Sequence, residues 1–346
     1  MLFIAPERDD RMVNEEKIIE VEGLRKYYII GDWISRLVGS YKLVKAVDGI
    51  SYHIKARETL GLVGESGCGK STTGKVTILL EPPTQGRILY RGREITDHLS
   101  KQELKKLRSK IQIVFQDPQS SLNRRRSIGS IISDPLKIHT SLNRKQRQKR
   151  IKEVMEMVDL PQKFGSRYPY ELSGGQRQRV GVARALVVQP EVIICDEPVT
   201  SLDVSVQAKI INLLMDLQSE LGLSYLFIAH DLSVVKHVSH RIAIMYLGDL
   251  VEQSTVKNIF ENPLHPYTKA LLAAIPPMDP NKVGTRRSLK GEVPSALNPP
   301  SGCKFHPRCP EFIGDICVNE IPKMIECSEG HFVKCHLHSC EDEKKG

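Results

Sequence analysis

An eight-residue segment has the residue types and the spacing of a phosphate-binding loop. Residues 64–71 read Gly-Glu-Ser-Gly-Cys-Gly-Lys-Ser, which matches the pattern G-x-x-x-x-G-K-[ST]. Glycines let backbone N–H groups turn inward onto phosphate oxygens, and a helix that starts near Lys70 adds its positive dipole end. Lys70 can reach the β- and γ-phosphates, and Ser71 can ligate Mg²⁺. The predicted nucleotide-binding residues of this segment are Gly64, Glu65, Ser66, Gly67, Cys68, Gly69, Lys70, Ser71 and Thr72.

Two adjacent acids follow an apolar run farther along the chain. Residues 192–195 read Val-Ile-Ile-Cys, and Asp196 and Glu197 come directly after them. The first acid can hold Mg²⁺ through water, and the second can polarise an attacking water molecule. A solvated strand end would have the same sequence. Beside a phosphate loop, the pair predicts hydrolysis of the bound nucleotide.

A third motif lies between these two. Residues 172–179 read Leu-Ser-Gly-Gly-Gln-Arg-Gln-Arg. Ser173 and the N–H groups of Gly174 and Gly175 fall at the start of a predicted helix, which makes a second anion site. On its own the segment also fits a helix cap with a glycine hinge. With the phosphate loop upstream and the acid pair downstream, it resembles the signature motif of the ATP-binding cassette (ABC) ATPases.

This resemblance implies roles for further residues. In the family the signature, here Ser173, Gly174, Gly175 and Gln176, closes on the γ-phosphate of ATP held by a partner subunit. Gln116 in Val-Phe-Gln-Asp-Pro matches the Q-loop, Asp203 in Ser-Leu-Asp the D-loop, and His230 in Ala-His-Asp the switch histidine. The implied catalytic residues are Glu197, His230, Gln116 and Asp203, and the implied Mg²⁺ ligands are Ser71, Gln116 and Asp196. Tyr28 resembles the aromatic residue that stacks on adenine, with Tyr27 as the competing choice.

The elements that must position these residues follow from the hydrophobic pattern. Residues 18–54 predict strand, loop and strand, and residues 58–63 predict a short strand before a helix over 70–80. The stretch 97–162 is polar, mostly helical by pattern and without a long strand. Strand-like runs at 192–195 and 225–229 alternate with helical periodicity at 205–221 and 232–238, which predicts a parallel sheet.

Three further segments narrow the resemblance. They are residues 119–123, residues 168–173 and above all residues 259–271, Ile-Phe-Glu-Asn-Pro-Leu-His-Pro-Tyr-Thr-Lys-Ala-Leu. Together they resemble the oligopeptide/dipeptide/nickel importer ATPases over about 18–337. The resemblance implies a peripheral protein at the cytoplasmic face of the membrane. Its implied partners are a homologous second ATPase, two membrane-spanning permease subunits and an extracytoplasmic solute-binding protein, and the cargo stays open among peptides, nickel and oligosaccharides.

Six of the eight cysteines fall within 38 residues near the end of the chain. In a chain without a signal peptide, such clustering favours a metal site over a disulfide framework. The spacing Cys303-x5-Cys309-x7-Cys317-x17-Cys335 resembles the motif that holds a [4Fe–4S] cluster in this subfamily, while four thiolates also suit Zn²⁺. The resemblance leaves Cys327 and Cys340 as spares and makes His331 and His336 outer donors. The remaining two, Cys68 and Cys195, are expected to be buried packing residues.

Length, composition and charge set the outer limits. A chain of 346 residues with 40% hydrophobic and 26% charged residues fits a large globular domain with an appendage. It has no run long enough to span a bilayer. The net charge of +9 also suits an alternative, a soluble ABC ATPase that acts on nucleic acid or ribosomes. A single phosphate loop and a single signature, separated by 100 residues, count against it, so no nucleic-acid partner is expected.

The predicted fold is α/β, an ABC-type P-loop NTPase domain with an antiparallel β subdomain and a helical subdomain. A small cysteine-rich C-terminal regulatory or metal domain is expected to follow. The expected boundaries are an N-terminal extension over 1–17, the ATPase domain over 18–260 with its helical subdomain at about 97–185, a proline-rich linker over 261–300, and the cysteine-rich domain over 301–346.

Overall fold

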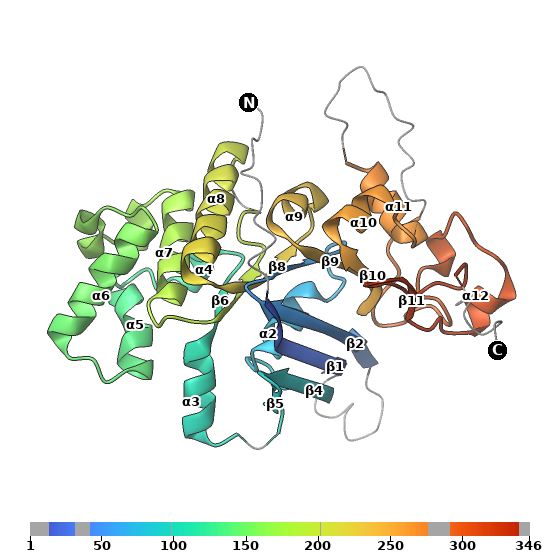
Figure 1. Cartoon of the computed structure of the whole chain (residues 1–346), viewed down its shortest axis with the longest axis horizontal. Coiled ribbons are helices and arrows are strands. Elements are labelled where there is room, and N and C mark those ends of the chain that lie inside the picture. Colours follow the sequence, from blue (N-terminus) through green and yellow to red (C-terminus); the bar gives the residue numbers. More distant parts are fainter. Residues whose placement is uncertain (1–13, 32–41, 98, 201, 276–290, 339–346) are drawn as a thin grey trace.

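The computed structural model describes residues 14–31, 42–97, 99–200, 202–275 and 291–338, which form two β-sheets with helices around them (Figure 1). One sheet has four strands in the order β2-β1-β4-β5, and the other has eight in the order β11-β12-β10-β9-β3-β8-β7-β6. Among the helices of these ranges, none combines the length and the apolar character that crossing a membrane requires.

The smaller sheet is antiparallel and is built mainly from the N-terminal part of the chain. Its strands are β1 (Asn14–Ile30), β2 (Lys42–Ala56), β4 (Gln85–Tyr90) and β5 (Arg93–Glu94). The central strand β1 pairs with both β2 and β4. Its alternate residues Ile19 and Val21 are buried in the hydrophobic core that the two sheets share. The two predicted strands are thereby confirmed, while residues 32–41 of the expected loop lie outside the described ranges.

The larger sheet has a parallel centre. Its parallel strands are β3 (Thr59–Val63), β6 (Ile111–Val114), β7 (Val192–Asp196), β8 (Ser224–Ala229) and β9 (Arg241–Tyr246). Every residue of β3, β7 and β8 is buried, as expected for strands covered on both faces. In the β7–β8 register Asp196 lies opposite Ile228, so the carboxyl ends of these strands meet at one edge. Ligands of open α/β sheets bind at such an edge.

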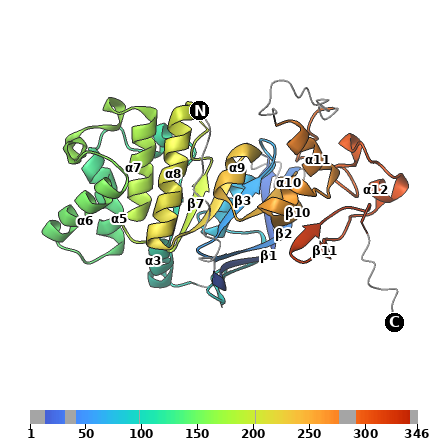
Figure 2. The ribbon, with the colours of Figure 1, turned by 45° about the horizontal axis from the view of Figure 1, so that its top comes forward.

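Helices pack around the larger sheet, and several of them form one end of the molecule. They are α2 (Lys70–Thr77), α3 (Lys101–Lys110), α4 (Pro118–Ser121), α5 (Ile128–His139), α6 (Arg144–Met157), α7 (Gly174–Leu186), α8 (Val204–Leu221) and α9 (Leu232–Val238). Figures 1 and 2 both place α5, α6 and α7 at the end of the molecule opposite the C-terminal region. The expected helical stretch differs in one respect, because β6 lies inside it and pairs with β7 of the large sheet. Four residues are too few to give a periodic strand signal.

The C-terminal region adds strands to the large sheet. It contains β10 (Asp249–Thr255), α10 (Val256–Glu261), α11 (Pro266–Ala273), α12 (Asp315–Asn319), β11 (Ile325–Ser328) and β12 (His331–Val333). Strand β12 pairs antiparallel with β10, so that Glu252 lies opposite Val333. The expected linker over 261–300 therefore begins with a packed helix, α11, whose Tyr267 is fully buried. Residues 276–290, with three of the prolines, lie outside the described ranges.

Candidate functional site

The phosphate loop connects β3 to α2, as the sequence predicts. A Cβ at Gly64 would lie 2.1 Å from the carbonyl oxygen of Met245, and one at Gly69 would lie 2.0 Å from that of Ala46. Gly69 also has a φ of 108° and is the N-cap of α2. Only glycine fits both places, because the loop passes directly over the backbones of β9 and β2. The close approach fixes where the N-terminus of α2 points.

Lys70 and Ser71 occupy the first turn of α2. The buried Lys70 Nζ donates to the carbonyl oxygens of Gly64 at 2.8 Å and Glu65 at 2.9 Å. Ser71 Oγ donates to Asp196 Oδ1 at 2.8 Å. Burial raises the pKa of the Asp196 carboxyl, and the hydrogen bond from Ser71 opposes that rise. Two of the three predicted Mg²⁺ ligands are thus in direct contact across the loop.

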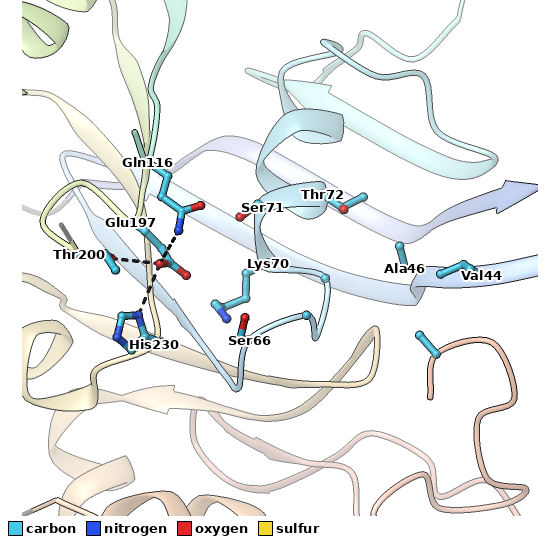
Figure 3. Close-up of a pocket in the computed structure, with 13 residues that line it drawn as sticks. Val44, Ala46, Ser66, Lys70, Ser71, Thr72, Gln116, Glu197, Thr200 and His230 are labelled. Carbon is cyan, nitrogen blue, oxygen red and sulfur yellow. Dashed lines mark hydrogen bonds and ion pairs between the residues drawn. The ribbon is translucent and has the colours of Figure 1, made fainter. Parts of the chain in front are cut away.

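Glu197 is the meeting point of three other side chains. Its Oε2 accepts a hydrogen bond from Gln116 Nε2 at 3.0 Å and from Thr200 Oγ1 at 3.0 Å, and it lies 3.4 Å from His230 Nδ1 (Figure 3). Gln116, Glu197 and His230 follow the neighbouring parallel strands β6, β7 and β8, which explains how residues so far apart in sequence converge. Glu197 has a φ of 44°, a strained value for a non-glycine residue. Thr200 was not predicted from the sequence, where its only signal is its place three residues after Glu197.

A cavity of about 440 Å³ opens between the phosphate loop and Glu197. Predicted residues form most of its wall, and sequence analysis missed the rest. The predicted ones are Ser66, Gly67, Gly69, Lys70, Ser71, Thr72, Gln116, Glu197 and His230, and the missed ones are Val44, Ala46, Thr200 and Ala296. Glycine N–H groups and an ammonium can donate to phosphate oxygens, and a carboxylate can accept from water. One pocket therefore has the groups that a nucleoside triphosphate with Mg²⁺ requires.

Neither candidate for the adenine contact lines this cavity. The Tyr28 hydroxyl hydrogen-bonds with Glu81 and Thr72, and burial together with Glu81 raises the Tyr28 pKa to about 12. The Tyr27 hydroxyl donates to Asp48 instead. Since Thr72 is part of the cavity wall, Tyr28 lies beside the site. The choice of Tyr28 stays a prediction.

The signature segment begins α7, as the sequence predicts. Ser173 is the N-cap: its Oγ accepts from Gln176 N at 3.3 Å, while its own N–H donates to Gln176 Oε1 at 3.0 Å. Asp203 caps α8 in a similar way by accepting from Val206 N at 2.9 Å, a bond that lowers the pKa of Asp203. Ser173, Gly174, Gly175, Gln176 and Asp203 do not line the cavity of this chain. Ser201, also in the predicted D-loop, lies outside the described residues.

The structure does not support the expected [4Fe–4S] cluster or the alternative Zn²⁺ site. Within the described ranges, no group of three or more His, Cys, Asp or Glu side chains is arranged to hold a metal ion. Cys303, Cys309, Cys317 and Cys335 are free thiols. Burial raises the pKa of Cys309 and of Cys335 to about 11, and their neighbouring cysteines add to the rise.

The other tail residues named by sequence analysis have separate partners. His331, expected as an outer donor, pairs instead with the buried Glu252 at 2.8 Å. His336 Nε2 lies 2.9 Å from the carbonyl oxygen of Glu320. Cys327 is exposed, and Cys340 lies beyond the described residues. The two remaining cysteines, Cys68 and Cys195, are buried as expected.

Comparisons with known proteins identify the family. Residues 47–200 match the family described as "ABC transporter", and residues 251–317 match "Oligopeptide/dipeptide transporter, C-terminal region". The chain is 49% identical to the oligopeptide transport ATP-binding protein AppF of Bacillus subtilis, with 94% of this chain and 99% of that protein covered. It is 47% identical to the dipeptide transport ATP-binding protein DppF of Haemophilus influenzae, with the same coverage.

A solved structure supports the same assignment. The post-hydrolysis dimer of the ATP-binding cassette MJ0796, bound to ADP and Pi, is 29% identical with a TM-score of 0.61 and covers 69% of this chain and 98% of its own. That cassette is bound to ADP and Pi, in agreement with the cavity between Lys70 and Glu197. The chain therefore belongs to the ATP-binding proteins of ABC transporters, within the oligopeptide/dipeptide transport family.

Proposed function

We propose that this chain is the ATP-hydrolysing subunit of an ABC importer for oligopeptides or dipeptides. As a member of its family the chain is an ABC ATPase. The observation that carries the proposal is the convergence of Lys70, Ser71 and Glu197 on one cavity, with Asp196 hydrogen-bonded to Ser71. Peptide cargo is supported by relatives such as AppF, whose names specify peptide transport. The nucleic-acid alternative finds no support among these relatives.

The proposed chemistry assigns separate roles to the charged and polar side chains at the site. Lys70 Nζ exchanges its two carbonyl partners for phosphate oxygens when ATP enters. Mg²⁺ bound with ATP neutralises developing charge on the phosphates, and Ser71, Asp196 and Gln116 are the residues that would hold it. Glu197 orients and polarises the attacking water, and His230 donates to the γ-phosphate.

The signature would act on the nucleotide of a second ATPase. Ser173, with the N–H groups of the first turn of α7, lies outside this chain's cavity. A head-to-tail pair of ATPases would bring it onto the partner's γ-phosphate, and the dimeric MJ0796 structure supports such a pair. The further partners that we propose are a homologous second ATPase, two membrane-spanning permease subunits and an extracytoplasmic solute-binding protein, with this chain on the cytoplasmic face of the membrane.

The test separates binding from hydrolysis at two residues. Glu197→Gln should keep ATP affinity and lower turnover by about a hundredfold or more, because it removes the group that polarises water. Lys70→Ala should weaken ATP binding itself. Equilibrium binding of ATP and steady-state phosphate release on both variants provide the two readouts. Turnover close to wild type in Glu197→Gln would contradict the assignment.

We further propose that Cys303, Cys309, Cys317 and Cys335 bind a [4Fe–4S] cluster with a structural role. Support comes from the spacing of the four cysteines and its resemblance to the cluster motif. Protein purified without oxygen should be brown and contain about four irons per chain. The exposed Cys327 provides the control, since Cys327→Ser should keep the iron. Stoichiometric zinc, or no metal at all, would refute the cluster.

A further inference from the structure

The C-terminal region makes direct contact with the phosphate loop. Arg308 and Glu65, 243 residues apart, form a bidentate ion pair: Nη1 lies 2.8 Å from Oε2 and Nη2 lies 3.1 Å from Oε1. The Arg308 side chain is 6% exposed, and that of Glu65 is 25% exposed. Two parallel charge-assisted bonds on a nearly buried guanidinium fix the orientation of the carboxylate as well as its position.

A second contact holds the backbone of the same loop residue. The N–H of Glu65 donates to the Tyr267 hydroxyl at 3.0 Å. The ring of Tyr267 is itself fixed between Tyr246 and Phe305, with centroids 4.8 Å and 5.4 Å away. Arg308 reaches the same group, since its Nη1 lies 3.4 Å from the Tyr246 hydroxyl. Both contacts on Glu65 are thus built on one packed aromatic cluster.

The backbone carbonyl of Glu65 contacts the lysine that is expected to bind the nucleotide phosphates. That oxygen accepts a hydrogen bond from Lys70 Nζ at 2.9 Å. One residue is therefore bound by the phosphate-binding lysine on one side and by the C-terminal region on the other. A carboxylate here, left without its arginine, would repel the incoming triphosphate. The tail reaches the site at a second point as well, because Ala296 lines the nucleotide cavity.

We infer that Arg308, together with Tyr267, is a positioning residue for ATP binding. By pairing with Glu65 it holds the phosphate loop in its binding conformation and neutralises the loop's own carboxylate. The inference rests on the proposed function, since it assigns the C-terminal region a part in ATP affinity. If Arg308 only held the C-terminal region in place, loss of another ion pair that does the same should affect ATP binding equally. The tail is tied to the rest of the chain elsewhere, by Lys334–Asp249 at 2.6 Å and Lys304–Asp48 at 2.9 Å.

The experiment compares Arg308→Ala with Lys334→Ala in the full chain. Both substitutions remove one partner of an ion pair between the tail and the core, and both residues precede a cysteine of the tail, so their structural effects are matched. Arg308→Ala should raise the Kd and the KM for ATP by about tenfold and change kcat little. Lys334→Ala should leave both constants near wild type. Equal effects of the two variants on ATP affinity, or none from Arg308→Ala, would overturn the inference.

Two more variants distinguish the contact with Glu65 from general damage to the tail. Adding Glu65→Gln to Arg308→Ala removes the unpaired carboxylate, so the double variant should regain part of the lost affinity. Arg308→Lys keeps the charge without the bidentate geometry and should lie between wild type and Arg308→Ala. Losses that simply add in the double variant would refute the pairing. Such a result would leave wild-type ATP turnover and its dependence on Lys70 unchanged. It would therefore refute the role of Arg308 and not the proposed function.

Discussion

Thr200 shows how a residue without a recognisable motif can complete a catalytic group. Its hydroxyl and the Gln116 amide both donate to the same oxygen of Glu197. Two donors on one carboxylate oxygen leave the other oxygen available for a water molecule. The side chain of Glu197 is only 12% exposed, so this orientation is well defined, while that of His230 is 51% exposed and remains open to the nucleotide.

We expect Thr200→Val to lower kcat by about three- to tenfold, because one hydrogen bond that orients Glu197 is lost. The KM for ATP should stay near wild type, since Thr200 makes no bond to the phosphate loop in this structure. Thr200→Ser keeps the hydroxyl and is the matched control. Steady-state phosphate release at varied ATP measures both constants. A change in KM alone would show that Thr200 contributes to binding and not to the orientation of Glu197.

His265 predicts a specific acid sensitivity of the fold. Burial lowers its pKa to about 4 from 6.5, against the opposing charge of Glu252. Its Nδ1 accepts from Tyr267 N at 3.0 Å at the start of α11. The unfolded chain binds the proton near pH 6.5 and the folded chain only near pH 4. The contribution of this residue to the unfolding free energy is therefore complete above pH 6.5 and lost as the pH falls to 4.

We expect His265→Asn, which keeps an acceptor at the N-cap, to reduce the loss of stability between pH 6.5 and 4. The pKa difference corresponds to about 3 kcal/mol at most. Urea unfolding of both proteins at pH 7, 5.5 and 4 measures the effect. Parallel pH profiles for wild type and His265→Asn would contradict it.

At the scale of elements, the phosphate loop depends on how closely it approaches its neighbours. A Cβ at Gly69 would lie 2.0 Å from the Ala46 carbonyl oxygen in β2, at a residue whose φ is 108°. We expect Gly69→Ala to separate the loop from β2 and to weaken ATP binding by a hundredfold or more, about 3 kcal/mol. The control is Gly92→Ala, which has a φ of 72° but no atom within 4 Å of its Cβ.

Gly92→Ala should cost about 1 kcal/mol of stability from its backbone strain and leave ATP affinity unchanged. Nucleotide titration and thermal unfolding of the two variants separate the local clash from the strain. Similar ATP affinities in the two variants would show that the close approach of the loop to β2 is not needed for binding.

The elements that sequence analysis predicted well are those with a local signal. The helix over 232–238 and the strand over 192–195 follow from periodicity and from motif context, and the structure has both, with the strand extending to Asp196. Strand β12 has three residues and depends on a partner about 80 residues away, at Glu252. No local pattern encodes such a pairing. The same holds for Arg308 and Glu65, whose contact spans 243 residues.

The whole molecule has the signature and the phosphate loop on different elements. Ser173 caps the N-terminus of α7, one of the helices at one end of the molecule (Figure 1), and Lys70 begins α2, which contacts strands of both sheets. Nothing in the cavity wall comes from the signature. If two such chains, or this chain and a homologue, pair head to tail, each ATP would be held by the loop of one and the signature of the other. Nucleotide binding by the phosphate loop and contact by the signature can then be disabled separately.

The division of labour can be tested in a complex of this chain with the homologous second ATPase that we propose as its partner. Ser173→Arg in this chain places a bulky cation at the start of α7, where the partner's γ-phosphate is expected. We expect the partner's site to lose turnover by at least tenfold, while ATP loading at Lys70 of this chain stays near wild type. Lys70→Ala in this chain should give the reverse pattern, with ATP lost here and retained at the partner's loop. Nucleotide cross-linking that resolves the two chains measures occupancy at each loop. Equal loss of nucleotide from both chains in Ser173→Arg would rule out the division of labour, because the substitution would then not act on the partner's site alone.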